Sequence, residues 1–274
     1  MQVNKDGRKA GNEIEHKIEI LDQSGAVKAS AGGAEVRLVY RGVYEPGDVI
    51  RVTPGEVPAS YLLQLDESGG LSVVYLTGVM EYEIPFGEKR TNLSPHTFAD
   101  GLHLLTLKKY PEFLHQVYRN LALNVWDQHG LENSFPHAAA NVETRGEAVF
   151  AAQNAIDGVT ANESHGEWPF ESWGINMQDD AEITIDFGRE VEIDRIVMYT
   201  RADFPHDNWW TQVTFSFSDG SSLDWDLEKQ TLPHIITFEP KRVRSLTMHD
   251  MKKAEDPSPF PALTQLEVYG REVF

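Results

Sequence analysis

The stretch AEITIDF, residues 181–187, alternates polar residues with two isoleucines and a phenylalanine. Successive side chains of a β-strand point to opposite faces of a sheet, so this period of two residues predicts a strand with one buried face. The same alternation recurs in VTFSF (213–217) and LDWDL (223–227). Strands that are apolar on one face and polar on the other are typical of antiparallel sheets, and we therefore predict an antiparallel β-sandwich here.

The first half of the chain has the same character. Short runs rich in β-branched and aromatic residues are separated by turn sequences such as EPGD, TPGEVP and DESGG, which is typical of many short strands. The best helical candidate, residues 111–123, ends in what reads as extended chain. We therefore predict an all-β protein of two antiparallel β-sandwich (jelly-roll) domains, residues 1–110 and 111–274, with the boundary near residues 108–119. The runs that predict N-terminal strands are AEVRLVY (34–40), DVIRV (48–52), YLLQL (61–65), LSVVYL (71–76), YEI (82–84) and GLHLLTL (101–107).

Charge and composition narrow the classes of partner. The 274 residues include 43 Asp and Glu against 24 Lys and Arg, which gives a formal net charge of −19. Such a field repels polyanions and anionic membrane surfaces, and this argues against nucleic acid as a partner. The sequence contains no cysteine, so disulfides and thiolate chemistry are excluded.

The sequence also gives an expectation for the cellular location of the protein. The start, MQVNKDGRKAGNEIEHK, has no apolar segment of a signal peptide, and no apolar run reaches the length of a membrane span. We expect a protein without membrane insertion that is cytoplasmic as written. An extracellular location is expected only if the sequence is a trimmed piece of a secreted protein. No pattern in the sequence defines an oligomeric state.

Five short strings from residue 119 onward carry a resemblance to a known superfamily. In this order they resemble the landmarks of the galactose-binding-like β-sandwich superfamily, which includes discoidin domains and related bacterial carbohydrate-binding modules. The resemblance implies a galactose-binding-like fold for the C-terminal domain and non-catalytic binding of a glycan or small saccharide. Residues 1–110 carry no comparable signature, so no role is predicted for that domain. The strings are RNLALN (119–124), AAQNAIDG (151–158), ITIDFG (183–188), FSFSDGS (215–221) and LTQLEVYG (263–270).

The resemblance also implies a structural Ca²⁺. Members of the superfamily often hold this ion with backbone carbonyls, the Asp of the NAIDG string, a hydroxyl or amide oxygen a few residues on, and a Glu from the last strand. The matching positions are Asp157, Asn162 and Gln265. The Gln departs from the pattern, because its carbonyl can bind Ca²⁺ but the site loses a formal charge and is weakened. A plain Asx turn at Asp157 is the alternative.

The loop ANESHGEWPFESWG (161–174) is the first candidate for ligand contact. It is longer than the short T-x-W that the family has here, and long irregular loops in compact domains tend to be functional. His165 and Trp168 are its candidate ligand residues, and one of its tryptophans is expected to fill the sandwich. A packed loop without a ligand is the alternative.

A second loop follows the strand that ends near residue 200. Related modules use loops at this end of the sandwich for sugar contacts. Sugars stack their C–H faces on aromatic rings, and their hydroxyls bond to planar polar groups. One of the two adjacent tryptophans is expected in the core, since neighbours in an extended chain point to opposite faces, and a structural ion pair of the arginine is the alternative to ligand contact. The candidate residues are Arg201, Asp203, His206, Asp207, Asn208, Trp209 and Trp210.

An enzyme is the rival class. Histidines such as His129 and His137 and nearby carboxylates such as Asp127 are candidates for acid–base pairs, but the sequence contains no HExxH, GxSxG, P-loop or Rossmann pattern. These observations favour binding over catalysis, with a glycan-processing hydrolase or lyase as the alternative and a protein–protein interaction module as the third class. Phe260, in the proline-rich segment 252–264, is expected to plug the sandwich, with a docking anchor as the alternative.

Overall fold

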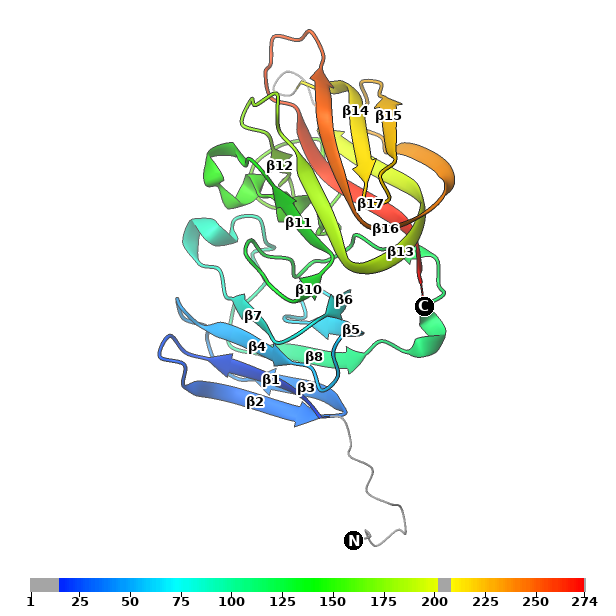
Figure 1. The fold of residues 1–274 in the computed structure, drawn as a ribbon. Coiled ribbons are helices and arrows are strands. Elements are labelled where there is room, and N and C mark those ends of the chain that lie inside the picture. Colours follow the sequence, from blue (N-terminus) through cyan, green and yellow to red (C-terminus); the bar gives the residue numbers. More distant parts are fainter. Residues whose placement is uncertain (1–14, 202–207, 274) are drawn as a thin grey trace, which may run out of the picture.

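The computed structural model describes residues 15–201 and 208–273, and nearly all regular structure in these ranges is β-strand (Figure 1). The described strands surround two hydrophobic cores, one for each half of the chain. The strands around the first core are β1 (His16–Leu21), β2 (Val27–Gly33), β3 (Glu35–Tyr40), β4 (Val49–Thr53), β5 (Ala59–Gln64), β6 (Ser72–Leu76), β7 (Met80–Glu83), β8 (His103–Lys109) and β10 (Ser134–Phe135).

These strands form two antiparallel sheets, which together we call the N-terminal lobe. The strand orders are β2-β1-β4-β7 and β10-β6-β5-β8-β3. Side chains from both sheets, among them Ile18, Ile50, Leu63 and Leu107, are fully buried in one core. The sheets therefore pack face to face, in agreement with the predicted sandwich.

The strands around the second core form what we call the C-terminal sandwich. They are β9 (Arg119–Asn120), β11 (His137–Ala140), β12 (Trp173–Gly174), β13 (Ile183–Arg201), β14 (Trp210–Phe217), β15 (Ser222–Asp226), β16 (His234–Lys253) and β17 (Ala262–Glu272). Short 3₁₀ helices lie in the connections of both parts: η1 (Gly87–Arg90), η2 (Glu112–Leu114), η3 (Thr144–Gly146), η4 (Ala148–Phe150) and η5 (Ala152–Ile156).

Two long strands close the C-terminal sandwich. The order is β12-β17-β13-β16-β14-β15, with β11 also beside β13 and β9 beside β17. β13 and β16 curve along their length, so that one continuous sheet bends around the core (Figure 1). Ile183 and Phe187 near the start of β13 and Met198 near its end are all fully buried in that core. The alternation predicted for residues 181–187 is confirmed.

The chain passes between the two parts more than once. β9 pairs with β17, but Trp126 and Leu131 belong to the core of the N-terminal lobe, and β10 pairs with β6 before β11 joins β13. Near the predicted boundary, 108–119, the chain therefore first reaches the sandwich, and segment 125–135 then returns to the lobe.

The helical candidate at residues 111–123 forms only the single turn of η2. Phe113 is 81% exposed and Val117 is 45% exposed, whereas Leu121 is buried in the sandwich core as part of the extended chain around β9. Across residues 15–201 and 208–273, no helix has the length and apolarity needed to cross a membrane.

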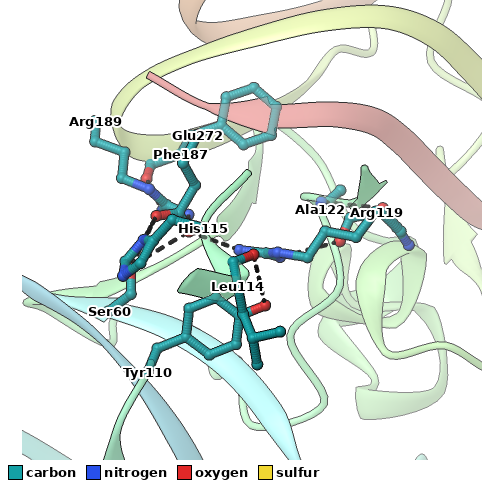
Figure 2. A network of polar contacts seen from close by, with 10 residues as sticks. Ser60, Tyr110, Leu114, His115, Arg119, Ala122, Phe187, Arg189 and Glu272 are labelled. Carbon is teal, nitrogen blue, oxygen red and sulfur yellow. Dashed lines mark hydrogen bonds and ion pairs between the residues drawn. The ribbon is translucent and has the colours of Figure 1, made fainter. Parts of the chain in front are cut away.

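A buried ion cluster joins the lobe to the sandwich (Figure 2). Glu272, at the end of β17, accepts hydrogen bonds from Arg119 and Arg189 at 2.7 Å each and pairs with His115. Ser60 of β5 donates to the same carboxylate from the lobe, at 3.3 Å. Burial alone would raise the pKa of Glu272, but the positive partners, Arg189 foremost, lower it below its ordinary value. The ionised carboxylate is thus a fixed link between the two parts.

Candidate binding site and cation site

The NAIDG turn positions the first candidate residue. Asp157 ends η5, and its Oδ1 accepts a hydrogen bond from the Val159 amide at 2.8 Å, so the Asx turn is present. Gly158 has φ +90°, and a Cβ there would lie 2.9 Å from Cδ1 of Leu123, which explains the glycine. Gln265 of β17 accepts a hydrogen bond from the Gly158 amide at 3.1 Å, so the turn holds Asp157 close to the last strand.

A second carboxylate, Glu171, reaches the same place from the 161–174 loop. The carboxyl groups of Glu171 and Asp157 lie within hydrogen-bonding reach of each other. Glu171 is 1% exposed, and no N–H or hydroxyl of another described residue donates to either of its carboxyl oxygens. Burial raises the pKa of Glu171 to about 7, and burial together with the Glu171 carboxylate raises the pKa of Asp157 well above its ordinary value. A cation or a shared proton would neutralise such a pair.

The other two predicted metal ligands differ from each other. Asn162 is buried, and its amide donates to the carbonyls of Thr200 at 3.0 Å and Thr231 at 2.8 Å. It therefore ties its loop to the end of β13 and to the chain before β16 rather than bonding to the Asp157 turn. Gln265 is fully buried beside that turn, and its Nε2 has no partner in the described part of the chain. Within the same ranges, no three His, Cys, Asp or Glu side chains gather as a metal site. Asp157, Glu171 and Gln265 instead offer an oxygen-only set, which suits a hard cation.

A cavity of about 490 Å³, which we call the loop-end cavity, opens where β13 ends and β17 begins. Arg201, the last residue of β13, lines it and is 5% exposed. Its guanidinium carbon lies 5.9 Å from the centre of the Phe150 ring, and that of Arg145 lies 5.5 Å from the same ring. Both distances are within the range of cation–π contact, so two planar donors are held at one aromatic ring.

The rim of the loop-end cavity is apolar. Phe260 is 45% exposed and Met177 is 51% exposed, and both line the cavity. The prediction that Phe260 plugs the sandwich is therefore wrong, because its ring lies at the surface. Trp173 fills the core instead, at 0% exposure, with its indole N–H donating to the Val142 carbonyl at 2.9 Å.

The structure brings some of the predicted ligand residues to this cavity. His165 lines it together with Arg201. Asn208 is buried, and its backbone and side-chain amides donate to the carbonyls of Phe260 and Ala254, so it positions the loop that carries the Phe260 ring.

Other predicted ligand residues lie elsewhere. Trp210 is 1% exposed and belongs to the core, which is the position expected for one of the two tryptophans, and Trp209 is half-buried. Trp168 is 39% exposed, but its backbone amide bonds to the Thr91 carbonyl of the N-terminal lobe, and it does not line the loop-end cavity. Asp203, His206 and Asp207 lie outside the described residues.

One predicted acid–base pair forms, at a different place. His137 Nδ1 lies 2.7 Å from Asp127 Oδ1, and this hydrogen bond raises the pKa of His137. The Asp127 side chain is 0% exposed, and its other oxygen accepts the Ala138 amide at 2.8 Å. The pair therefore fastens the start of β11 through a carboxylate that is sealed from solvent.

A comparison with known protein families gives a match, and it lies in the C-terminal sandwich. Residues 137–258 match the family described as the F5/8 type C domain. These residues form an F5/8 type C domain. No curated protein shows a significant match to the chain.

Several solved structures are similar to the chain. Chitosan-binding module 1 of a chitosanase/glucanase from Paenibacillus sp. IK-5 is 21% identical, with 55% of this chain and 98% of that chain covered and a TM-score of 0.37. The family 32 carbohydrate-binding module of C. perfringens NanJ, solved with galactose, is 17% identical, with 56% and 99% covered and a TM-score of 0.40. The lectin domain of lectinolysin, solved with Lewis B antigen, is 18% identical, with 56% and 97% covered and a TM-score of 0.42.

The F5/8 type C domain contains the candidate site residues that the sequence did not reveal. Glu171 is one of them, and a signal for it was present: ESW at 171–173 has the form of T-x-W, with Glu171 in the place of the Thr and Trp173 in the core. Phe150 and Arg145 had no such signal, because only the fold brings their 3₁₀ turns beside the end of β13.

Proposed function

We propose that this protein binds a glycan in the loop-end cavity and neither makes nor breaks a covalent bond. The observation that carries the proposal is the half-exposed Phe260 ring at the rim of a cavity that also contains Arg201 and Arg145. An exposed ring offers an apolar face to sugar C–H groups, and a guanidinium offers planar donors to sugar hydroxyls. The cavity is of a size that small-ligand sites have, about 300–1,000 Å³.

A glycan array compared between the parent protein and Phe260→Ala tests this proposal. We expect a defined set of glycans to bind the parent, and the variant to lose about fivefold in affinity, since aromatic stacking contributes roughly 1 kcal/mol. Phe113→Ala is the matched control, because Phe113 is also an exposed phenylalanine but lies in η2, away from the cavity. A blank array, or new products in mass spectra of glycans incubated with the protein, would contradict non-catalytic glycan binding.

We also propose that Asp157, Glu171 and Gln265 hold a structural Ca²⁺. The support is the pair of buried carboxyl groups, together with the Glu171 oxygens that no other described residue satisfies. The ion would supply the positive charge that the pair lacks, and it would fasten η5, the 161–174 loop and β17 to one point. This role is structural, and chelation is expected to lower the melting temperature.

Glu171 would also restore a charge to the proposed ion site. Gln265 stands where the resemblance expects a carboxylate, and Glu171 supplies a carboxylate that the resemblance, which implied the neutral Asn162, did not include. Two carboxylates therefore remain in the proposed set, and this favours Ca²⁺ over a site with Asp157 alone.

A further inference from the structure

A second, larger cavity continues from the loop-end cavity toward the N-terminal lobe. Its volume is about 1060 Å³, and it is lined from one side by Glu83, Glu88 and Thr91 and from the other by Glu147, Gln153 and Glu167; we call it the interlobe cleft. Arg145, Phe150 and His165 line both cavities, so the two are contiguous.

Hydrogen bonds across its walls fix the interlobe cleft. The Trp168 amide donates to the Thr91 carbonyl at 2.9 Å, and the His129 amide donates to the Gln153 side chain at 2.9 Å. Below these, Asn92 donates to Asn154 at 2.9 Å through a buried side-chain bond. With the Glu272 cluster as a further link (Figure 2), the lobe and the sandwich are held together at two places, so the cleft is preformed.

The side chains of the interlobe cleft carry an excess of negative charge. Glu83 lies 3.4 Å from Lys89, and Glu147 lies 2.6 Å from Arg145, so these charges are compensated. In the part of the chain that the structure describes, no cation pairs with Glu88 or Glu167, and both residues are exposed. Exposed carboxylates on a preformed surface, together with the Phe150 ring of the lining, suit a sugar that carries a positive charge.

We propose that the interlobe cleft binds the further units of a glycan chain whose end lies in the loop-end cavity. The uncompensated carboxylates favour units with protonated amino groups and disfavour acidic units. The N-terminal lobe is thereby part of the binding surface, and a longer chain binds more tightly than its end unit alone. This inference rests on the proposed glycan binding and names its class: oligosaccharides that contain amino sugars.

Calorimetric titration with β-1,4-linked glucosamine oligomers of one to six units tests the inference, with galacturonic acid oligomers of the same lengths as the acidic series. We expect affinity for the glucosamine series to rise with length. The variant Glu88→Gln/Glu167→Gln should bind the longer glucosamine oligomers about three- to tenfold more weakly than the parent, since two exposed ion pairs contribute this much. Its affinity for single glucosamine should not change, because neither residue lines the loop-end cavity. Glu132→Gln/Glu239→Gln, which removes two exposed carboxylates that do not line the cleft, is the matched control.

The outcomes separate this inference from the proposed function. Glucosamine affinity that does not depend on length, or a length effect that Glu88→Gln/Glu167→Gln leaves intact, would overturn the inference while glycan binding stands. Equal affinity for the galacturonic acid series would do the same, as would an array that shows only glycans without amino sugars. An array without any bound glycan, together with titrations that show no heat of binding, would overturn both the inference and the proposed function. A length effect confined to glucosamine, weakened by the double variant and screened by high salt, would support the inference.

Discussion

Replacing Glu171 with Gln is expected to change how the stability of the cation-free protein depends on pH. The pKa of the Glu171 carboxyl is raised from 4.5 to about 7 by burial, so between these values the folded state holds a proton that the unfolded state has released. Stability therefore falls as pH rises through this window, and the loss is complete above about pH 7. A rise of this size at about 1.4 kcal/mol per pKa unit corresponds to roughly 3 kcal/mol. Gln cannot ionise, so the variant should not suffer this loss.

Calcium should have the opposite effect in the parent protein. The ion needs deprotonated carboxylates, so it competes with protons and restores stability where the cation-free protein has lost it. An ion present at about 100 times its dissociation constant adds roughly 2.7 kcal/mol. We expect Ca²⁺ to raise the melting temperature at about pH 8 and to have little effect near pH 5, where the pair holds its protons. Glu171→Gln removes one charge and should lose most of this stabilisation.

Urea denaturation at the two pH values, with EDTA or with Ca²⁺, measures both effects. Glu182→Gln is the control, because Glu182 is an exposed carboxylate and the change removes the same formal charge. Parent and Glu171→Gln proteins that lose equal stability between the two pH values in EDTA would refute the argument from the buried pair. A parent protein with the same stability in EDTA and in Ca²⁺ at the higher pH would refute the ion site.

Three further changes test other contacts. Glu272→Ala leaves the largely buried guanidinium groups of Arg119 and Arg189 without their carboxylate. We expect the free energy of unfolding, measured by urea denaturation, to fall by about 3–5 kcal/mol. A fall below about 1 kcal/mol would contradict a buried link between lobe and sandwich. Gly158→Ala should lower the free energy of unfolding by about 2–3 kcal/mol, and Gly220→Ala by only about 1–2 kcal/mol. Both glycines have positive φ, but only a Cβ at position 158 meets another side chain, that of Leu123. Equal losses would contradict this close contact. Asn208→Ala should lower both stability and glycan affinity, because it loosens the loop before β17; calorimetry that finds unchanged affinity would show that this loop does not shape the site.

The fold could be predicted from the sequence to the extent that each strand faces one core. Residues 181–187 alternate because one face of β13 is buried and the other is not, and that pattern is local. The return of segment 125–135 to the N-terminal lobe is not local, because it depends on a gap in another core that Trp126 fills. The apolar spacing at residues 111–123 predicted a helix wrongly for a related reason, since Phe113 stays exposed and Leu121 reaches the sandwich core from extended chain.

The candidate site was predicted less completely. Arg201 could be named because it lies where a sandwich strand ends, and His165 because it lies in a loop longer than the family's. Glu171 was missed although ESW at 171–173 has the form of T-x-W, because the rest of its loop is as polar as an exposed loop. The exposure of Phe260 was missed for the converse reason, because phenylalanine is usually buried and only the position of the loop shows otherwise.

The path of the chain through Trp126 has a consequence for how such proteins evolve. The Trp126 indole fills the lobe core so closely that a Cβ on Gly69 would lie 2.2 Å from its Cη2. β9, which precedes Trp126 in the sequence, pairs with β17 of the sandwich. No single cut in the chain separates the two cores without leaving a hole in one of them. The sandwich could therefore be transferred to another protein intact only together with the lobe. We therefore expect that neither the lobe nor the sandwich folds when it is produced alone, and that limited proteolysis does not release either of them intact.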